Sequence, residues 1–339
     1  MKVVRRVTLF GVLPLVLVLA AGYGWYQWSD TGKGWRYEDK LASYCDGLIP
    51  YAESAVFTDL NTEVGLSRDL KHEAGDESFD SCAVADMRVT VGLVADDSAN
   101  SVGFNMLDML HTDSSDYLPV ALGGGWQGYT DMRNTAVVLP CQNTSASLVV
   151  SIATDESHED VAEARAMGEL AAATARKAAE HWSCEGTFGG RIPKVSLPAE
   201  HTFPDSAAGT CEGVPSRALP FEWVMETTGS SSAPLERCAL SDTMDSEVPS
   251  YYLDASFGPF AQRLRTTSDD LDGMNGNAGI EDDMAWGTAS CPGTAVRALF
   301  SIEATQNAAP TKSTLLSSLR PFAERSAARH RCTDVELPA

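Results

Sequence analysis

Eight cysteines in two sets of four constrain this fold more than any other feature of the sequence. They are Cys45, Cys82, Cys141, Cys184, Cys211, Cys238, Cys291 and Cys332. An even number of cysteines is typical of disulfide bonds formed in an oxidising compartment. No Cys-x-x-Cys pair occurs, so neither a zinc ribbon nor a thioredoxin-type motif has support. We therefore expect all eight cysteines to form disulfide bonds.

The segments around the cysteines occur twice in the same order. The sequence CDGL at residues 45–48 resembles CEGV at residues 211–214, and LVVSI at 148–152 aligns with ALFSI at 298–302 without a gap. Each copy then has a helical stretch that ends at its fourth cysteine. This order indicates a duplication with two globular domains rather than a solenoid. We place the domains at residues 29–199 and 200–339, after an N-terminal segment of residues 1–28.

Apolar patterns predict the main elements of each copy. In the first copy we expect strands at residues 88–94, 135–140 and 147–154 and a helix at 161–182. Residues 251–253, 295–302 and 315–331 repeat the strand–strand–helix order. Residues 59–81 are polar and acidic and predict a loop. The glycines of residues 123–128 predict another loop.

The lengths of these elements favour one disulfide pairing. The helix of the first copy runs back across the sheet after the preceding strand, so its end returns to the turn that holds Cys141. We therefore expect Cys141–Cys184 and, by the repeat, Cys291–Cys332, which leaves Cys45–Cys82 and Cys211–Cys238. The alternative is nested, with Cys45 bonded to Cys184 and Cys82 to Cys141, because four cysteines allow three pairings.

The N-terminal segment has the pattern of a membrane anchor. Three basic residues precede Val7, and no charged residue follows until after Trp28. This pattern predicts a single transmembrane helix, and the positive-inside rule places the N-terminus in the cytoplasm and the bulk of the chain outside. A cleaved signal peptide is the alternative, with residues 19–22 as a weak cleavage site.

The charge balance argues against two kinds of partner. The chain has 25 basic and 47 acidic residues, a formal net charge of -22. Such a surface repels nucleic acid and anionic lipid headgroups. The partners that we expect are the membrane, through the N-terminal helix, and an envelope protein or a small ligand.

The order of cysteines and elements resembles that of the exported domains of actinobacterial envelope lipoproteins. It is also similar to the extracellular sensor domain of one class of mycobacterial serine/threonine kinases. The resemblance implies an α+β fold in which each copy is an antiparallel sheet with helices on one face, and a binding or sensing role. It carries over no catalytic residue. The chain differs because it lacks the lipobox cysteine, is duplicated and has a fourth cysteine that ends a helix.

No motif of catalysis or metal binding is present in the sequence. There is no Gly-x-Ser-x-Gly elbow and no His-Glu-x-x-His. The acidic residues of 269–283 do not meet the spacing of a calcium loop. Ser151 and Ser301 match between the copies but lie in apolar runs, and His181 and His330 each lie close to a fourth cysteine. We expect no cofactor, no metal and no catalytic residue.

Two tryptophans are the candidate binding residues. Trp126 and Trp286 precede the third cysteine of their copies, each near glycines. An exposed ring on such a loop stacks on a sugar or a peptide, whereas the alternative is a ring packed in the core. The leading hypothesis is a membrane-anchored extracytoplasmic binding or sensing protein without catalytic activity. An envelope hydrolase of unrecognised type and a scaffold for other envelope proteins are the alternatives.

Overall fold

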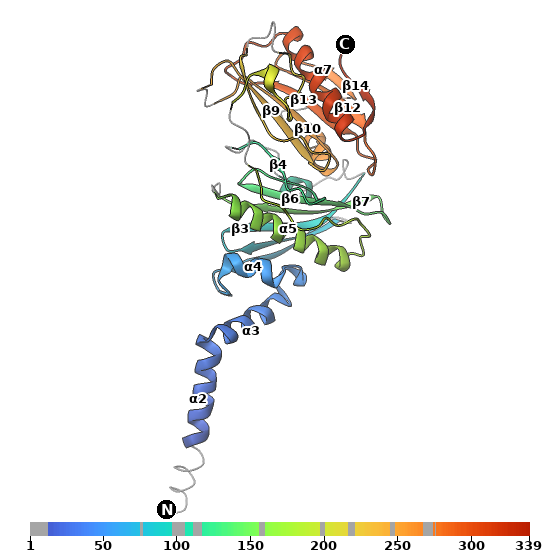
Figure 1. Ribbon diagram of the computed structural model, residues 1–339. Helices are drawn as coiled ribbons and strands as arrows, with labels where there is room; N and C mark the ends of the chain where they lie inside the picture. Colours follow the sequence, from blue (N-terminus) through green and yellow to red (C-terminus); the bar gives the residue numbers. More distant parts are fainter. Residues whose placement is uncertain are drawn as a thin grey trace, which may run out of the picture.

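Two α+β domains follow one another along the chain. The computed structural model describes residues 13–74, 77–96, 106–110, 117–155, 160–196, 201–215, 221–244, 248–266, 274 and 276–339. Figure 1 shows helices α2 (Leu13–Trp28) and α3 (Asp30–Leu41) leading from the N-terminal end to the first domain, with the second domain stacked on its far side. The boundary that we expected between residues 199 and 200 lies outside the described residues.

The prediction of a transmembrane helix is wrong for the described part of the chain. The described part of helix α2 extends from Leu13 to Trp28. Polar and charged residues dominate helix α3, which begins directly after it at Asp30. Among the residues that the structure describes, no helix is both long enough and apolar enough to cross a bilayer.

The first domain contains a seven-stranded antiparallel sheet. Its strands are β1 (Asp69–Ala74), β2 (Glu77–Val84), β3 (Met87–Ala95), β4 (Val120–Ala121), β5 (Gln127–Thr130), β6 (Asn134–Pro140) and β7 (Ala146–Ala153), in the order β1-β2-β3-β7-β6-β5-β4. The short helices η2 (Tyr44–Gly47) and α4 (Tyr51–Thr58) precede the sheet. The turn η4 (Met106–Met109) follows β3, and helix α5 (Val161–His181) follows β7.

The second domain repeats this strand order. Its sheet contains β8 (Trp223–Glu226), β9 (Leu235–Ser241), β10 (Tyr251–Ser256), β11 (Ala278–Ile280), β12 (Met284–Ser290) and β13 (Ala298–Ala304), in the order β11-β12-β13-β10-β9-β8, with β14 (Thr333–Glu336) beside β12. The remaining helices are η5 (Pro204–Ser206), α6 (Pro259–Thr266) and α7 (Lys312–Arg329). Strands β2, β3, β7 and β6 therefore correspond to β9, β10, β13 and β12.

Each sheet buries one face under its closing helix. Small and apolar residues of α5 pack on the first sheet, in a core that includes Val89, Val150 and Leu170. Phe322 and Leu319 of α7 fill the same place in the second domain. Burial of these apolar groups contributes most of the stability of each domain.

The second domain packs on the open face of the first sheet. Phe260 of α6 is fully buried and meets the ring of Tyr129 edge-on, with centroids 5.4 Å apart. Gln262 Nε2 donates to the carbonyl of Ala95 at 3.0 Å. Arg263 donates to the carbonyl of Leu107 at 3.0 Å, and its guanidinium lies 3.8 Å from the Asp108 carboxylate. The two domains therefore share an apolar contact that is bordered by directional hydrogen bonds.

Strands β1 and β2 occupy a segment that the sequence analysis assigned to a loop. The prediction was wrong because β1 is an edge strand, and its polar side chains do not show the apolar alternation of a half-buried strand. The backbone pairing with β2 runs without a break from Asp69 opposite Cys82 to Ala74 opposite Glu77. Pairing with β3 then places β2 inside the sheet.

A buried carboxylate lies two residues before the second cysteine of each domain. Glu236 is 1% exposed in the second domain and receives hydrogen bonds from Ser326 at 2.7 Å and Arg329 at 2.5 Å. His330 Nε2 lies 3.1 Å from its other oxygen. Burial opposes ionisation, but these three neighbours together hold the pKa of Glu236 below its ordinary value.

The corresponding carboxylate of the first domain lacks such a cluster within the described residues. Asp80 is 2% exposed, and burial raises its pKa. The charges of Asp46 and Asp69 act in the same direction, whereas Lys71 and His181 oppose them. The second domain therefore has a buried acid whose charged form is stabilised by its neighbours. In the first domain, burial disfavours the charged form of the matching acid.

We expect Asp80→Asn to raise the free energy of unfolding at pH 7 by on the order of 1 kcal/mol, because it removes a buried charge that Lys71 and His181 compensate only in part. An acid whose pKa is raised in the folded state costs stability only once pH exceeds its unfolded value, so the gain should vanish in acid. Urea unfolding between pH 3 and pH 8 measures this difference. Asp39→Asn removes an exposed carboxylate as the control, and a loss of stability on replacing Asp80 would contradict the assignment.

Candidate functional site: a groove on the first sheet

All eight cysteines form disulfide bonds, and the expected sequential pairing is confirmed. The bonds join Cys45 to Cys82, Cys141 to Cys184, Cys211 to Cys238 and Cys291 to Cys332. The nested alternative is wrong. In each domain one bond ties the start of the fold to the second strand, and the other ties the closing helix to the strand hairpin.

Both candidate tryptophans lie inside the domains. Trp126 is 1% exposed, its Nε1 donates to the carbonyl of Gly190 at 2.8 Å, and the guanidinium of Arg176 lies over its ring. Trp286 is 4% exposed in strand β12, where its Nε1 has no hydrogen-bond partner among the described residues. In this conformation neither ring is available to stack on a ligand. A role for either tryptophan in binding stays a prediction.

The other sequence candidates do not come together. Ser151 is buried in β7 and donates to the carbonyl of Met109 at 3.3 Å. His330 belongs to the Glu236 cluster, and its ring stacks on Phe257. Most of the acidic stretch 269–275 lies outside the described residues. Among the described residues, no three His, Cys, Asp or Glu side chains are grouped to hold a metal ion.

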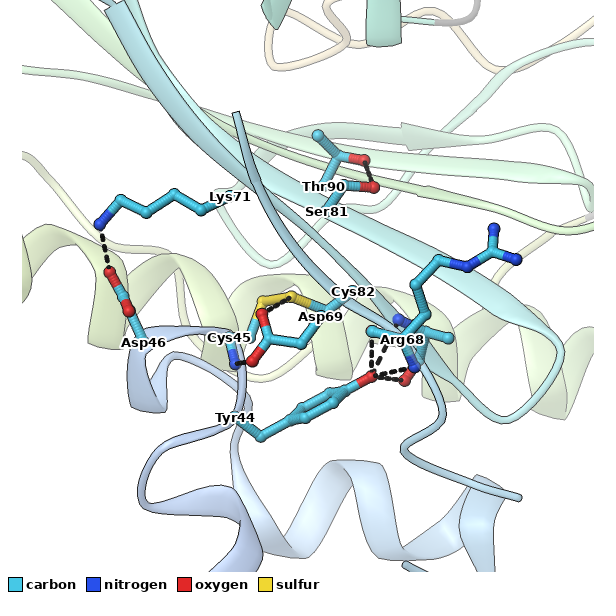
Figure 2. The surroundings of a disulfide bond; sticks show 10 residues. Tyr44, Cys45, Asp46, Arg68, Asp69, Lys71, Ser81, Cys82 and Thr90 are labelled. Atoms are coloured by element: carbon cyan, nitrogen blue, oxygen red, sulfur yellow. Dashed lines mark hydrogen bonds and ion pairs between the residues drawn. A yellow bond between two sulfur atoms is a disulfide. The ribbon is translucent and has the colours of Figure 1, made fainter. Parts of the chain in front are cut away.

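A cavity of about 830 Å³ lies on the open face of the first sheet. Its floor is formed by the small side chains of Ser81 and Ala83 on β2 and Ala153 on β7. Because successive strand residues face opposite sides, Ser81 lies on the open face while Cys82 turns toward the helices. Figure 2 shows Ser81 and Thr90 on one side of the strands and the Cys45–Cys82 disulfide on the other. The absence of larger side chains along these strands creates the hollow, which we call the groove.

Three arginines stand at the rim of the groove. Arg68 precedes β1, Arg88 lies near the start of β3 and Arg133 lies in the turn before β6. All three are exposed. The remaining rim is formed by residues of mixed character, Leu70, His72, Asp86, Asp108, Met109 and Asp155. The groove therefore combines a neutral floor with a rim that carries both signs of charge.

The register of the sheet places two of these arginines side by side. Ala83 lies opposite Arg88 on β3, and its backbone N–H donates to the carbonyl of Arg68 at 2.8 Å on the other side. Cross-strand neighbours share a face, so both arginines flank the small Ala83. With strands ~4.8 Å apart, their backbones are separated by about 10 Å.

The backbone of Arg68 is anchored by the N-terminal part of the domain. The hydroxyl of Tyr44 accepts hydrogen bonds from the N–H groups of Arg68 at 3.2 Å and Ala83 at 3.1 Å. The neighbouring Asp69 accepts from the backbone N–H of Cys45 at 2.9 Å. In Figure 2 the guanidinium of Arg68 extends away from this anchor. The disulfide and the tyrosine therefore fix the base of a side chain whose end is exposed.

The corresponding positions of the second domain are filled. Ser81 lies opposite Thr90 in the first sheet, and the matching pair in the second sheet is Arg237 opposite Asp254. The guanidinium Nε of Arg237 lies 2.5 Å from the Asp254 carboxylate. Glu303 on β13 and Ala153 on β7 lie opposite matching positions of β10 and β3, respectively. Glu303 therefore occupies the place of Ala153 in the second sheet. The open face of the sheet is therefore hollow in the first domain, whereas an ion pair occupies the same position in the second domain.

Sequence reasoning missed the groove because its residues carry no motif. Ser81, Ala83 and Ala153 are separated by up to 72 positions in the printed sequence, and only the strand register brings them together. One signal was available, since aligning the second cysteines sets Ser81 against Arg237. A small residue replaced by a long charged one on the open face marks a difference in how the two domains fill that face.

Comparison with known proteins adds no functional assignment. No protein-family model matches the chain, and neither a curated protein nor a solved structure matches it. The geometry and charge of the groove are therefore the basis for inferring a function.

Proposed function

We propose that the chain is a ligand-binding protein of an oxidising, extracytoplasmic compartment, and that it acts without catalysis. The location is supported by the four disulfide bonds, since such bonds persist outside the cytosol. The first domain provides the binding site, and the second domain supports it by packing on the same sheet.

The groove is the observation that carries this proposal. Its volume of about 830 Å³ falls within the 300–1,000 Å³ that is usual for sites of small ligands. The floor is part of a hydrogen-bonded sheet, which makes the hollow a preformed feature rather than a gap between loops. The second domain shows that the same fold can fill this position with an ion pair, so the hollow is not required by the architecture.

The filled second domain supplies the design of the test. The double substitution Ser81→Arg with Thr90→Asp places the Arg237–Asp254 pair at the corresponding position of the first sheet. We expect it to fill the groove with side chains that this sheet geometry accommodates. Thermal unfolding of the wild type and the variant would be measured with sugars, amino acids, short peptides, carboxylates and phosphates.

A ligand class should raise the melting temperature of the wild type and leave the filled variant unchanged, because binding to the folded state alone stabilises it. Arg191→Gln, which alters an exposed arginine outside the groove, serves as the control and should respond like the wild type. Equal responses of wild type and filled variant would remove the groove from consideration. A wild type that responds to no class would contradict the proposed function.

A further inference from the structure

We infer that the groove recognises one anionic group, a carboxylate or a phosphate, and that Arg68 and Arg88 hold it from two sides. This inference rests on the proposed function and specifies its ligand class. It follows from the pairing state of the arginines, their spacing and the acidic residues beside them.

Among the described residues, the rim arginines lack the carboxylate partners that six other arginines of the chain have. Six arginines lie within 4.0 Å of a carboxylate oxygen, namely Arg165, Arg237, Arg263, Arg297, Arg325 and Arg329. Within the described residues none of the three rim arginines forms an ion pair, although the chain carries 47 acidic residues. A guanidinium presents a fork of N–H donors that matches a carboxylate or a phosphate. The groove therefore presents three arginines that form no ion pair with any described residue.

The spacing suits a small anion. The backbones of Arg68 and Arg88 lie about 10 Å apart across two strand spacings, and only Ala83 stands between them. Two long side chains attached at this separation can converge over the small residue. Arg133 is held at the rim because its Nε donates to the carbonyl of Thr154 at 3.3 Å.

The acidic rim residues restrict the size of the ligand. Asp86 and Asp155 line the same cavity, so an extended polyanion would meet repulsion on leaving the space between the arginines. Asp108, the third acid, lies 3.8 Å from Arg263 of the second domain. This arrangement favours a compact ligand with a single anionic group over a nucleic acid or an anionic membrane surface.

Isothermal titration of the full chain with inorganic phosphate, propionate and glucose tests the inference. We expect phosphate or propionate to bind, with affinity that falls as salt is added, and glucose not to bind. Arg68→Gln and Arg88→Gln should each weaken binding at least about tenfold, as expected for loss of a charge-assisted contact. Arg191→Gln should bind like the wild type. A response to phosphate alone or to propionate alone identifies which of the two anions the site takes.

The outcomes separate this inference from the proposed function. Binding of a neutral ligand that the filled variant abolishes, but that Arg68→Gln and Arg88→Gln leave intact, would overturn the anion assignment and retain the groove. Anion binding that persists unchanged in the filled variant and in both arginine variants would place the anion elsewhere and overturn the inference. Circular dichroism of each variant shows whether a loss of binding reflects a loss of fold.

Discussion

Replacing Glu236 by glutamine is expected to lower the free energy of unfolding of the chain by about 3 kcal/mol, because it leaves a largely buried arginine without its counter-ion. The side chain of Glu236 is 1% exposed and that of Arg329 is 18% exposed. Ser326 and Arg329 both donate to the same oxygen of Glu236, so the oxygen of glutamine can still accept from them, but the neutral amide leaves the arginine charge unbalanced. Urea unfolding at pH 7 measures the change.

The replacement of both partners separates charge from packing. Glu236→Leu combined with Arg329→Met removes the pair together, and we expect it to cost less than Glu236→Gln alone, because neither charge is then left unpaired. If the double variant loses more stability than the single one, packing rather than the ion pair dominates at this position.

Protonation of Glu236 in acid should lower the free energy of unfolding. Its pKa is held below the ordinary value in the folded protein, so its contribution is present above the unfolded pKa and is lost as pH falls through the folded pKa. The wild type should therefore lose stability in acid more steeply than Glu236→Gln. The opposite behaviour is expected for Asp80, because burial raises its pKa.

Removal of the Cys141–Cys184 disulfide is expected to lower the free energy of unfolding by about 4 kcal/mol, since the unfolded chain regains the freedom of a long loop. The bond spans 43 residues. Cys141→Ala with Cys184→Ala avoids free thiols, and urea unfolding compares the variant with the oxidised wild type.

The second domain provides the matched comparison. The bond between Cys291 and Cys332 spans 41 residues and closes the corresponding hairpin and helix. Loop closure depends only weakly on length, so the two double variants should lose similar amounts. A loss below about 1 kcal/mol for either would show that the closing helix is held by packing alone.

The disulfide framework could be predicted because it follows from local geometry. A strand followed by a helix that runs back across it returns the chain to the hairpin, so Cys184 meets Cys141 whatever the details of the rest of the fold. The α+β class and the antiparallel sheets were predicted for the same reason, since the apolar runs that encode strands β3, β6 and β7 are visible in the sequence.

The remaining features depend on contacts between distant segments. Strand β1 has no apolar pattern, and its pairing with β2 exists only in the assembled sheet. The N-terminal apolar run predicted a transmembrane helix, whereas no helix in the described part of the chain is long and apolar enough to cross a membrane. The groove depends on the register that sets Ala83 between Arg68 and Arg88. No single segment of the chain contains this information.

The contact between Arg263 and Asp108 has a consequence for how the two domains must be studied. Asp108 lines the groove, and Arg263 belongs to helix α6 of the other domain. A first domain produced alone would lose this counter-ion and would present an additional negative charge to its own ligand. Its affinity for an anion should therefore be lower than that of the full chain, so the tandem arrangement makes the second domain a determinant of electrostatic selectivity in the first.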